Sequence, residues 1–215
     1  MGIYNCPSMD YSFPCGLWPP NLRSLEIGCL NKPMSKWGIQ NYPTSLVHLS
    51  LLGENSGVVS FVANAKDVTS TSFLLPPSLM TLTIFDFMEM DYSFPCGLWP
   101  PNLRRLQIGC LNKRMSEWGI QNYSTSLVHL TLYEVNSGVV SFVANTKDVT
   151  STSFLLPQSL MTLDILKFME LELVSEALQR LPYLKNLDIY SCPKLEDLRE
   201  TNTTSTSSLR IKWLE

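Results

Sequence analysis

The pattern Leu-x-x-Leu-x-(Leu/Ile) recurs along the chain and constrains its fold more than any other feature. It occurs seven times in full, with successive copies 24 or 33 residues apart. Its apolar positions are Leu22/Leu25/Ile27, Leu46/Leu49/Leu51, Leu79/Leu82/Ile84, Leu103/Leu106/Ile108, Leu127/Leu130/Leu132, Leu160/Leu163/Ile165 and Leu184/Leu187/Ile189. Alternate residues of a strand share one side of it. One such strand cannot bury its apolar side alone, so the pattern predicts strands stacked into a parallel sheet over a continuous core.

Partial copies of the pattern stand near both ends of the chain. Residues 3–9 resemble the end of the repeat around Ile189, and Leu209-Arg-Ile211 matches part of the pattern. Proline pairs precede three of the full copies, at 19–20, 76–77 and 100–101. Because proline cannot donate a hydrogen bond to a sheet, we expect these residues just before the strands, where they fix the turn.

Between the strands, the sequence predicts little regular structure. Only residues 173–181 resemble one or two helical turns, which Pro182 would end. Two related apolar segments, beginning at Ser56 and Ser137, would either form short strands or fill the core. The segments 67–72 and 148–153, both Asp-Val-Thr-Ser-Thr-Ser, are interpreted as solvated loops.

Leu-x-x-Leu-x-Leu followed three residues later by Asn or Cys is the signature of a leucine-rich repeat. The sequence therefore predicts an α/β fold, a leucine-rich-repeat solenoid that forms part of a horseshoe. A parallel sheet would line its concave face, and its convex side would be mostly irregular. We expect residues 1–215 to form a single domain of about eight or nine repeats. The Asn or Cys position keeps its usual residue only at Cys6 and Cys192, which predicts a less regular solenoid.

A tandem duplication overlies these short repeats. Residues 10–88 and 91–169 align at an offset of 81, with 14 differences in 79 positions. Eight of the differences fall among the twelve positions that we expect to point outward from the strands, and the inward hydrophobic residues do not differ. The eight pairs are Ser24/Arg105, Glu26/Gln107, Ser50/Thr131, Leu52/Tyr133, Gly53/Glu134, Thr83/Asp164, Phe85/Leu166 and Asp86/Lys167.

Two explanations account for this concentration of differences. Exposed residues can drift freely, or the concave face changed because its ligand changed. The segment 64–72, also expected to be exposed, carries a single change, which favours the second explanation. The candidate protein-binding residues are Ser24, Glu26, Ser50, Leu52, Thr83, Phe85, Asp86, Arg105, Gln107, His129, Thr131, Tyr133, Asp164, Leu166, Lys167, Asp188 and Tyr190. Among them Tyr133, Arg105, Phe85 and Tyr190 are the expected anchors, because aromatic residues and Arg dominate binding energy at interfaces.

Three motifs together resemble one family. They are Ile189-Tyr-Ser-Cys-Pro-Lys-Leu195, the Pro-x-Leu segments before the strands, and residues 174–181. The chain resembles the leucine-rich region of plant nucleotide-binding disease-resistance proteins of the coiled-coil type. This resemblance implies a cytoplasmic receptor region that recognises a pathogen effector or a guarded host protein and contacts its own nucleotide-binding domain. The chain has no phosphate-loop motif and no coiled-coil segment, and its first strand begins near Met1 without a polar cap, so we expect a fragment of a larger protein.

Composition and isolated residues argue against other classes. A net charge of −3 without a basic run disfavours nucleic-acid binding, and no apolar stretch is long enough to span a membrane. His48 and His129, the only histidines, would lie about 15 Å apart in the stack, since neighbouring strands are about 4.8 Å apart. With no Cys-x-x-Cys pair either, we expect no metal, no cofactor and no enzyme activity. A substrate adaptor for ubiquitin ligation, or another interaction scaffold, stays open as the alternative.

Overall fold

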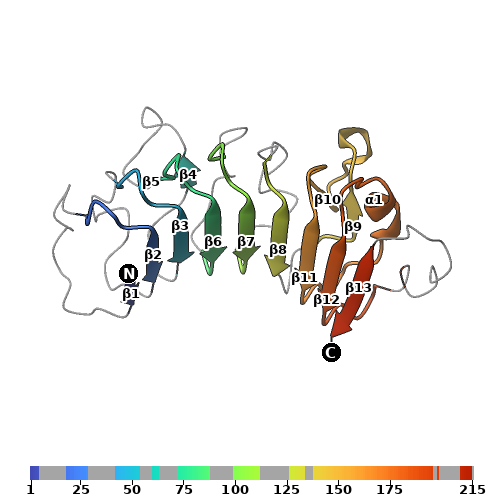
Figure 1. Ribbon diagram of the computed structural model, residues 1–215. Helices are drawn as coiled ribbons and strands as arrows, with labels where there is room; N and C mark the ends of the chain where they lie inside the picture. The colour runs from blue at the N-terminus through green and yellow to red at the C-terminus, as the bar shows by residue number, and fades with distance from the viewer. Residues whose placement is uncertain are drawn as a thin grey trace.

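The structure is a computed structural model that describes residues 1–4, 18–28, 42–53, 60–62, 72–87, 99–111, 126–133, 138–195, 198 and 209–214. Its main feature is a nine-stranded sheet whose neighbouring strands all run parallel (Figure 1). In order across the sheet, the strands are β1 (Gly2–Tyr4), β2 (Ser24–Gly28), β3 (His48–Leu52), β6 (Thr81–Phe85), β7 (Arg105–Gly109), β8 (His129–Tyr133), β11 (Thr162–Leu166), β12 (Asn186–Tyr190) and β13 (Arg210–Leu214). The order across the sheet is also the order along the chain.

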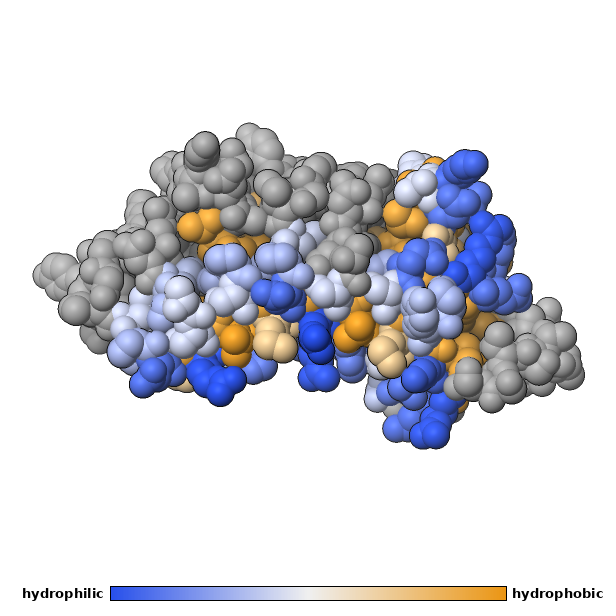
Figure 2. Space-filling model, turned by 45° about the horizontal axis from the view of Figure 1, so that its top comes forward, coloured by the Kyte–Doolittle hydropathy of each residue, from blue (hydrophilic) through white to orange (hydrophobic). Residues whose placement is uncertain are grey.

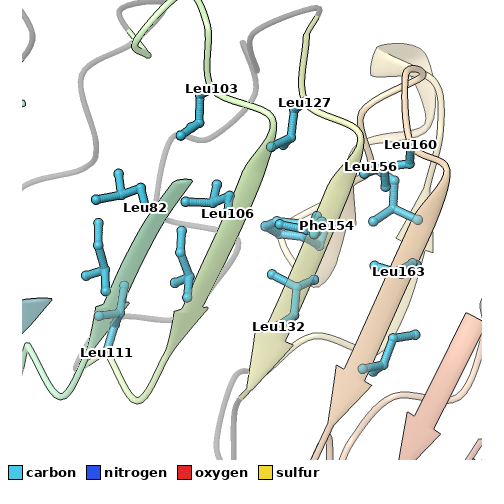
Figure 3. Packing of buried hydrophobic residues seen from close by; sticks show 14 of the residues in the cluster. Leu82, Leu103, Leu106, Leu111, Leu127, Leu132, Phe154, Leu156, Leu160 and Leu163 are labelled. Atoms are coloured by element: carbon cyan, nitrogen blue, oxygen red, sulfur yellow. The ribbon is translucent and has the colours of Figure 1, made fainter. Parts of the chain in front are cut away.

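The register of the strands aligns the repeated apolar residues in two buried lines. Leu25 pairs with Leu49, which pairs with Leu82, and this register continues to Leu187. None of the second and fourth residues of β2, β3, β6, β7, β8, β11 and β12 is more than 1% exposed. Burying each of these side chains contributes about 1.5–3 kcal/mol. The prediction that these strands stack into a parallel sheet over a continuous core is therefore confirmed (Figure 3).

Proline fixes the turn into several strands, as the sequence predicts. The Leu22 N–H donates to the Pro19 carbonyl oxygen at 3.0 Å, closing a turn just before β2. The same bond precedes β3, β6, β7 and β11, where Leu46, Leu79, Leu103 and Leu160 donate to Pro43, Pro76, Pro100 and Pro157. Leu103, Leu127 and Leu160 thus occupy equivalent places above successive strands (Figure 3).

Serine side chains connect four of the repeats, those of β3, β6, β8 and β11, to the repeat before. The Ser45 hydroxyl donates to the carbonyl oxygen of Leu22, and the Ser78 hydroxyl to that of Leu46. Ser126 and Ser159 make the same bonds in the second copy, to Leu103 and Leu127. The strand register is regular throughout the described sheet, so the expected irregularity is not observed there. Hydroxyl groups before the strands supply bonds between repeats where the usual Asn or Cys is missing.

Short strands and a helix lie on the side of the sheet that faces the core. Strands β4 (Ser60–Val62) and β5 (Ser72–Leu74) form one pair, and β9 (Ser141–Val143) and β10 (Ser153–Leu155) form another. Helix α1 (Ser175–Gln179) adds one short helix, and it ends before Pro182 as expected. In the described parts of the segments that begin at 56 and 137, residues 60–62 and 141–143 form short strands. Each strand places a phenylalanine, Phe61 or Phe142, in the core.

The two copies build the same core. Phe61 packs edge-to-face on Phe87 with ring centroids 5.1 Å apart, and Phe142 packs edge-to-face on Phe168 at 5.7 Å. Residues 148–152 are exposed or partly exposed, whereas Ser153 is buried and begins β10, so the solvated loop is one residue shorter than predicted. Residues 67–71 lie outside the described residues.

The structure confirms the partial repeat near the N-terminus and corrects the alignment of the one near the C-terminus. Ile3 is buried and pairs with Ile27, as a repeat of the Ile189 type requires. At the other end Ile211 pairs with Leu187 and Trp213 pairs with Ile189. The pattern Leu209-Arg-Ile211 is therefore shifted by two residues from its predicted alignment. Ile211 and Trp213 are 39% and 38% exposed because no described strand pairs with the far side of β13.

Candidate functional site

The first, third and fifth residues of each strand point away from the core and form the face that we call the open face. The alternating burial of the strands defines it, since the second and fourth residues are buried in β2, β3, β6, β7, β8, β11 and β12. The register places these outward residues in three rows across the sheet: a first row at the strand starts, a middle row and a last row. In the view of Figure 2, hydrophobic patches stay small and are separated by hydrophilic residues.

All seventeen candidate residues lie in these rows or in the turn directly after a strand. The first row holds Ser24, Arg105 and His129, the middle row holds Glu26, Ser50, Thr83, Gln107, Thr131, Asp164 and Asp188, and the last row holds Leu52, Phe85, Tyr133, Leu166 and Tyr190. Asp86 and Lys167 follow their strands in the left-handed region, at φ 61° and 58°. Ser24, Glu26, Asp86, Arg105 and Lys167 are exposed, and the other twelve are exposed or partly buried.

Two glycines that were expected to point outward are buried. A Cβ on Gly28 would lie 2.6 Å from the Cβ of Leu52, so the Leu52 side chain covers this position of the face. A Cβ on Gly53 would meet the ring of Phe87, a core residue, so Gly53 faces the core. Its counterpart Glu134 lies outside the described residues. The prediction for position 53 was wrong because the chain has already left the strand there.

A polar cluster forms in the second copy across strands β7, β8 and β11. The Asp164 carboxylate accepts a hydrogen bond from the Thr131 hydroxyl at 2.8 Å and lies 3.2 Å from His129 Nε2. Burial alone would raise the pKa of Asp164, but the His129 and Thr131 hydrogen bonds and the charges of His129 and Arg105 outweigh burial and lower it. The cluster therefore holds a charged, oriented carboxylate in the middle row.

The first copy cannot form this cluster. Thr83 occupies the place of Asp164, and its hydroxyl donates to the amide oxygen of Gln107 at 3.1 Å. His48 is exposed, whereas its counterpart His129 is partly buried. His48 is therefore a plain surface residue, whereas His129 is partly buried and paired with Asp164.

An aromatic cluster occupies the last row where the two copies meet. The Phe85 and Tyr133 rings contact each other edge-to-face, with centroids 6.0 Å apart, although β7 lies between their strands. Gly109 makes this contact possible, because a Cβ there would lie 2.5 Å from Phe85 Cε1 and 2.6 Å from the Tyr133 carbonyl oxygen. Lys167 Nζ lies over the Tyr133 ring at 5.1 Å, and its hydrogen bond to Tyr133 raises the pKa of Lys167. The cluster presents a cation on an aromatic platform.

The opposite side of the molecule offers a weaker candidate. A pocket lies between β9 and α1 and is lined by Phe142, Ala177 and Arg180 among others. The Arg180 guanidinium already pairs with Asp148 and Glu176. Within the described residues, no group of three or more His, Cys, Asp or Glu side chains is placed to hold a metal ion, and no helix is long and apolar enough to cross a membrane.

Sequence reasoning found the residues of the open face but missed how they interact. The serine bonds between repeats had a visible signal, since Ser precedes Leu at 45, 78, 126 and 159. The contact of Phe85 with Tyr133 had no such signal, because it joins strands that are not neighbours. The structure describes only some of the cysteines and tryptophans. Trp99 and Cys192 are buried and Cys110 is partly exposed, whereas Cys15, Cys29, Cys96, Trp37 and Trp118 lie outside the described residues.

Fold and face together define a class: a repeat-built, mostly parallel β-sheet protein with one open face of polar and aromatic side chains. No protein-family model, curated protein or solved structure matches the chain.

Proposed function

We propose that the chain is a leucine-rich-repeat solenoid whose open face binds a protein ligand, as the recognition region of an intracellular, cytoplasmic plant immune receptor. The ligand would be a pathogen effector or a host protein, and the chain has no nucleotide switch of its own in this proposal. Support for the solenoid comes from the strand order, the shared register and the two buried lines of leucine and isoleucine. Support for the receptor family comes from the motifs around Ile189 and residues 174–181.

One observation carries the proposal of protein binding: the two copies differ mainly on the open face. Seven of the ten positions in the rows of β2, β3 and β6 and the turn residue after β6 differ from their counterparts. The exposed segment 145–152 differs at only one of its eight positions. Free drift would change both exposed regions to a similar extent. Selection for a new ligand explains why change concentrates on one face while the buried hydrophobic residues stay identical.

The face also has the physical character of a binding surface. Its aromatic residues and Arg105 are partly or fully exposed, and such residues supply most binding energy at interfaces. Asp164 and Tyr133 are held in place by the contacts described above, which lowers the entropy that a ligand must overcome on binding. A broad face built by neighbouring strands fits a protein ligand better than a small molecule, because small-molecule sites are compact pockets.

Site-specific photo-crosslinking tests the proposal. The full chain, carrying a photo-reactive phenylalanine analogue at Tyr133 or Tyr190, is expressed in plant leaf cells and irradiated. The matched control carries the analogue at Leu173, an exposed residue on the β9 side of the molecule. We expect one discrete protein adduct from each open-face position and none of that mass from Leu173. Absence of an adduct at both open-face positions, or the same adducts at Leu173, would contradict the proposal.

The coding sequence upstream of Met1 in the parent gene separates the two receptor classes. A phosphate-loop motif there supports the immune receptor, because that loop binds the nucleotide of the switch. An F-box there would support a substrate adaptor for ubiquitin ligation and would overturn the receptor part of the proposal, while leaving protein binding by the open face intact.

A further inference from the structure

The charged residues of the open face are distributed unevenly between its two halves. The upstream half consists of β1, β2, β3 and β6, and the downstream half of β7, β8, β11, β12 and β13. On the described upstream strands and the residues flanking them, the charged side chains are Arg23, Glu26 and Asp86. On the described downstream strands and flanks they are Arg104, Arg105, Asp164, Lys167, Lys185, Asp188, Arg210 and Lys212. The side-chain charge is thus −1 upstream and six minus two, or +4, downstream, in a chain of net charge −3.

The duplication produced much of this difference. Ser24/Arg105 and Glu26/Gln107 each add one positive charge to the second copy, and Asp86/Lys167 adds two. Thr83/Asp164 removes one, so the described substitutions add three in total. Glu134 and Glu215, which follow β8 and β13, lie outside the described residues and would leave the downstream half positive.

The arrangement of the rows indicates how a ligand would lie. Cations stand along the first row and its edge, at Arg105 and Arg210, and again beyond the last row, at Lys167. Tyr133, Leu166 and Tyr190 are adjacent in the last row and partly exposed. Between them, Asp164 and Asp188 are paired neighbours in the middle row. Carboxylates accept hydrogen bonds and donate none, so the middle row suits a ligand backbone with N–H donors.

We propose that the downstream half binds an extended acidic segment of a partner protein; this inference rests on the proposed function. Acidic side chains of the segment contact Arg105, Lys167 and the cations of β13. Its apolar side chains pack on Tyr133, Leu166 and Tyr190, and its backbone N–H groups donate to Asp164 and Asp188. The face from β7 to β13 crosses four strand spacings, about 19 Å, which about six extended residues span.

A nucleic acid fits this surface less well than a peptide. Phosphate binding would need clustered cations without intervening carboxylates, and the middle row presents two carboxylates side by side. A phosphodiester backbone has no N–H group to donate to them. The apolar last row would also be left in contact with the charged backbone of a nucleic acid.

Fluorescence anisotropy with defined probes tests the inference on the full chain. The first probe is a labelled peptide of about twelve residues, enough to span the face, that repeats Asp-Phe-Glu-Leu. The second is its Asn-Phe-Gln-Leu isostere, and the third is an oligothymidine of similar length. We expect the acidic peptide to bind, the isostere to bind about tenfold more weakly, and the affinity for the acidic peptide to fall as NaCl rises from about 50 to about 300 mM.

The duplication supplies variants that the fold already tolerates. Arg105→Ser and Lys167→Asp install the residues that stand at positions 24 and 86 of the first copy. We expect the double variant to lose about tenfold or more in affinity for the acidic peptide. Lys147→Asp is the matched control for Lys167→Asp, because it makes the same Lys-to-Asp charge change on an exposed 3-10 helix away from the open face. Thermal melts followed by circular dichroism verify that each variant is folded.

Each outcome decides the inference. It is overturned if the isostere binds as tightly as the acidic peptide, if the oligothymidine binds more tightly than either, or if Lys147→Asp weakens binding as much as the double variant. Crosslinking at Tyr133 to a partner that lacks an acidic segment would also overturn it, but would leave the proposed function standing. Failure of crosslinking at both open-face positions contradicts the proposed function itself.

Discussion

The upstream and downstream halves of the open face stand on the same scaffold but present different chemistry. Behind both halves the buried lines, the serine bonds and the phenylalanine pairs repeat with the same residues. The proline turns before β2 and β6 recur before β7 and β11, whereas Ser124 replaces the Pro43 of the turn before β3. In front, the upstream half presents Ser24, Leu52 and Thr83, whereas the downstream half presents Arg105, Tyr133 and Asp164 in their places. The difference teaches that this fold separates the residues that determine stability from those that determine surface chemistry.

The largest expected effect is the loss of stability when a buried leucine is removed, and it should be equal in the two copies because their cores are built from the same residues. Leu49→Ala in β3 and Leu130→Ala in β8 each remove a fully buried side chain between two full-length strands. We expect each to lower the free energy of unfolding by about 2–5 kcal/mol, with the two values agreeing within about 1 kcal/mol. Urea denaturation followed by circular dichroism measures both. A much smaller loss in one copy would show that the copies do not share one core.

Substitution of the two last-row glycines, Gly28 and Gly109, is expected to destabilise the two copies to different extents. Gly109→Ala places a Cβ against Phe85 and the Tyr133 carbonyl oxygen, whereas Gly28→Ala meets only the Leu52 side chain. Because a backbone atom moves less easily than a side chain, Gly109→Ala should cost about 1–3 kcal/mol and Gly28→Ala less. The same denaturation experiment compares them, and an equal or reversed order would contradict the described aromatic contact.

Exchange of the aromatic residue is expected to have a smaller effect. Tyr133→Leu installs the first-copy residue and removes the edge-to-face contact with Phe85. The lost contact should cost about 0.5–1.5 kcal/mol in addition to any change in buried area. A double-mutant cycle with Phe85→Leu isolates this interaction, and a coupling energy near zero would show that the two rings do not interact in solution.

The smallest expected difference between the two copies is in how their stability depends on pH, and it arises only from Asp164. Its pKa is lowered in the folded state, so its stabilising contribution is complete above the unfolded pKa of about 3.9 and is lost as pH falls through the folded pKa. Asp164→Thr, the first-copy residue, should therefore reduce the difference in melting temperature between about pH 6 and about pH 3. Thr83→Val, at the equivalent position of the first copy, serves as the control and should leave that difference unchanged.

Much of the sheet was predictable because its signal is local. Leu-x-x-Leu-x-Leu specifies both the strand and its buried side, and near-even spacing then specifies the neighbours. The exception is β13, where Leu209, Ile211 and Trp213 all alternate correctly and two alignments satisfy the pattern equally well. Pairing with Leu187 and Ile189 decides between them, and that information lies in another part of the chain.

The sequence predicts which residues lie on the open face, but it does not predict how their side chains interact. Alternation along a strand is enough to place Tyr133 and Asp164 outward. Their interactions depend on distances between strands and on which neighbour lacks a side chain: Gly109 lets two aromatic rings meet across it, and Thr131 and His129 orient one carboxylate. Such contacts depend both on the strand register and on the size of the neighbouring side chains. They cannot be inferred from the sequence of one repeat alone.

The pairing of β6 with β7 joins the two duplicated units with the same register as the pairings inside each unit. A whole block of three sheet strands can therefore be inserted or deleted while every remaining strand keeps a matching neighbour. Recombination between such blocks therefore changes the number of repeats without creating a mismatched strand pairing. Each added block gives mutation a fresh surface to alter while the older surface stays unchanged.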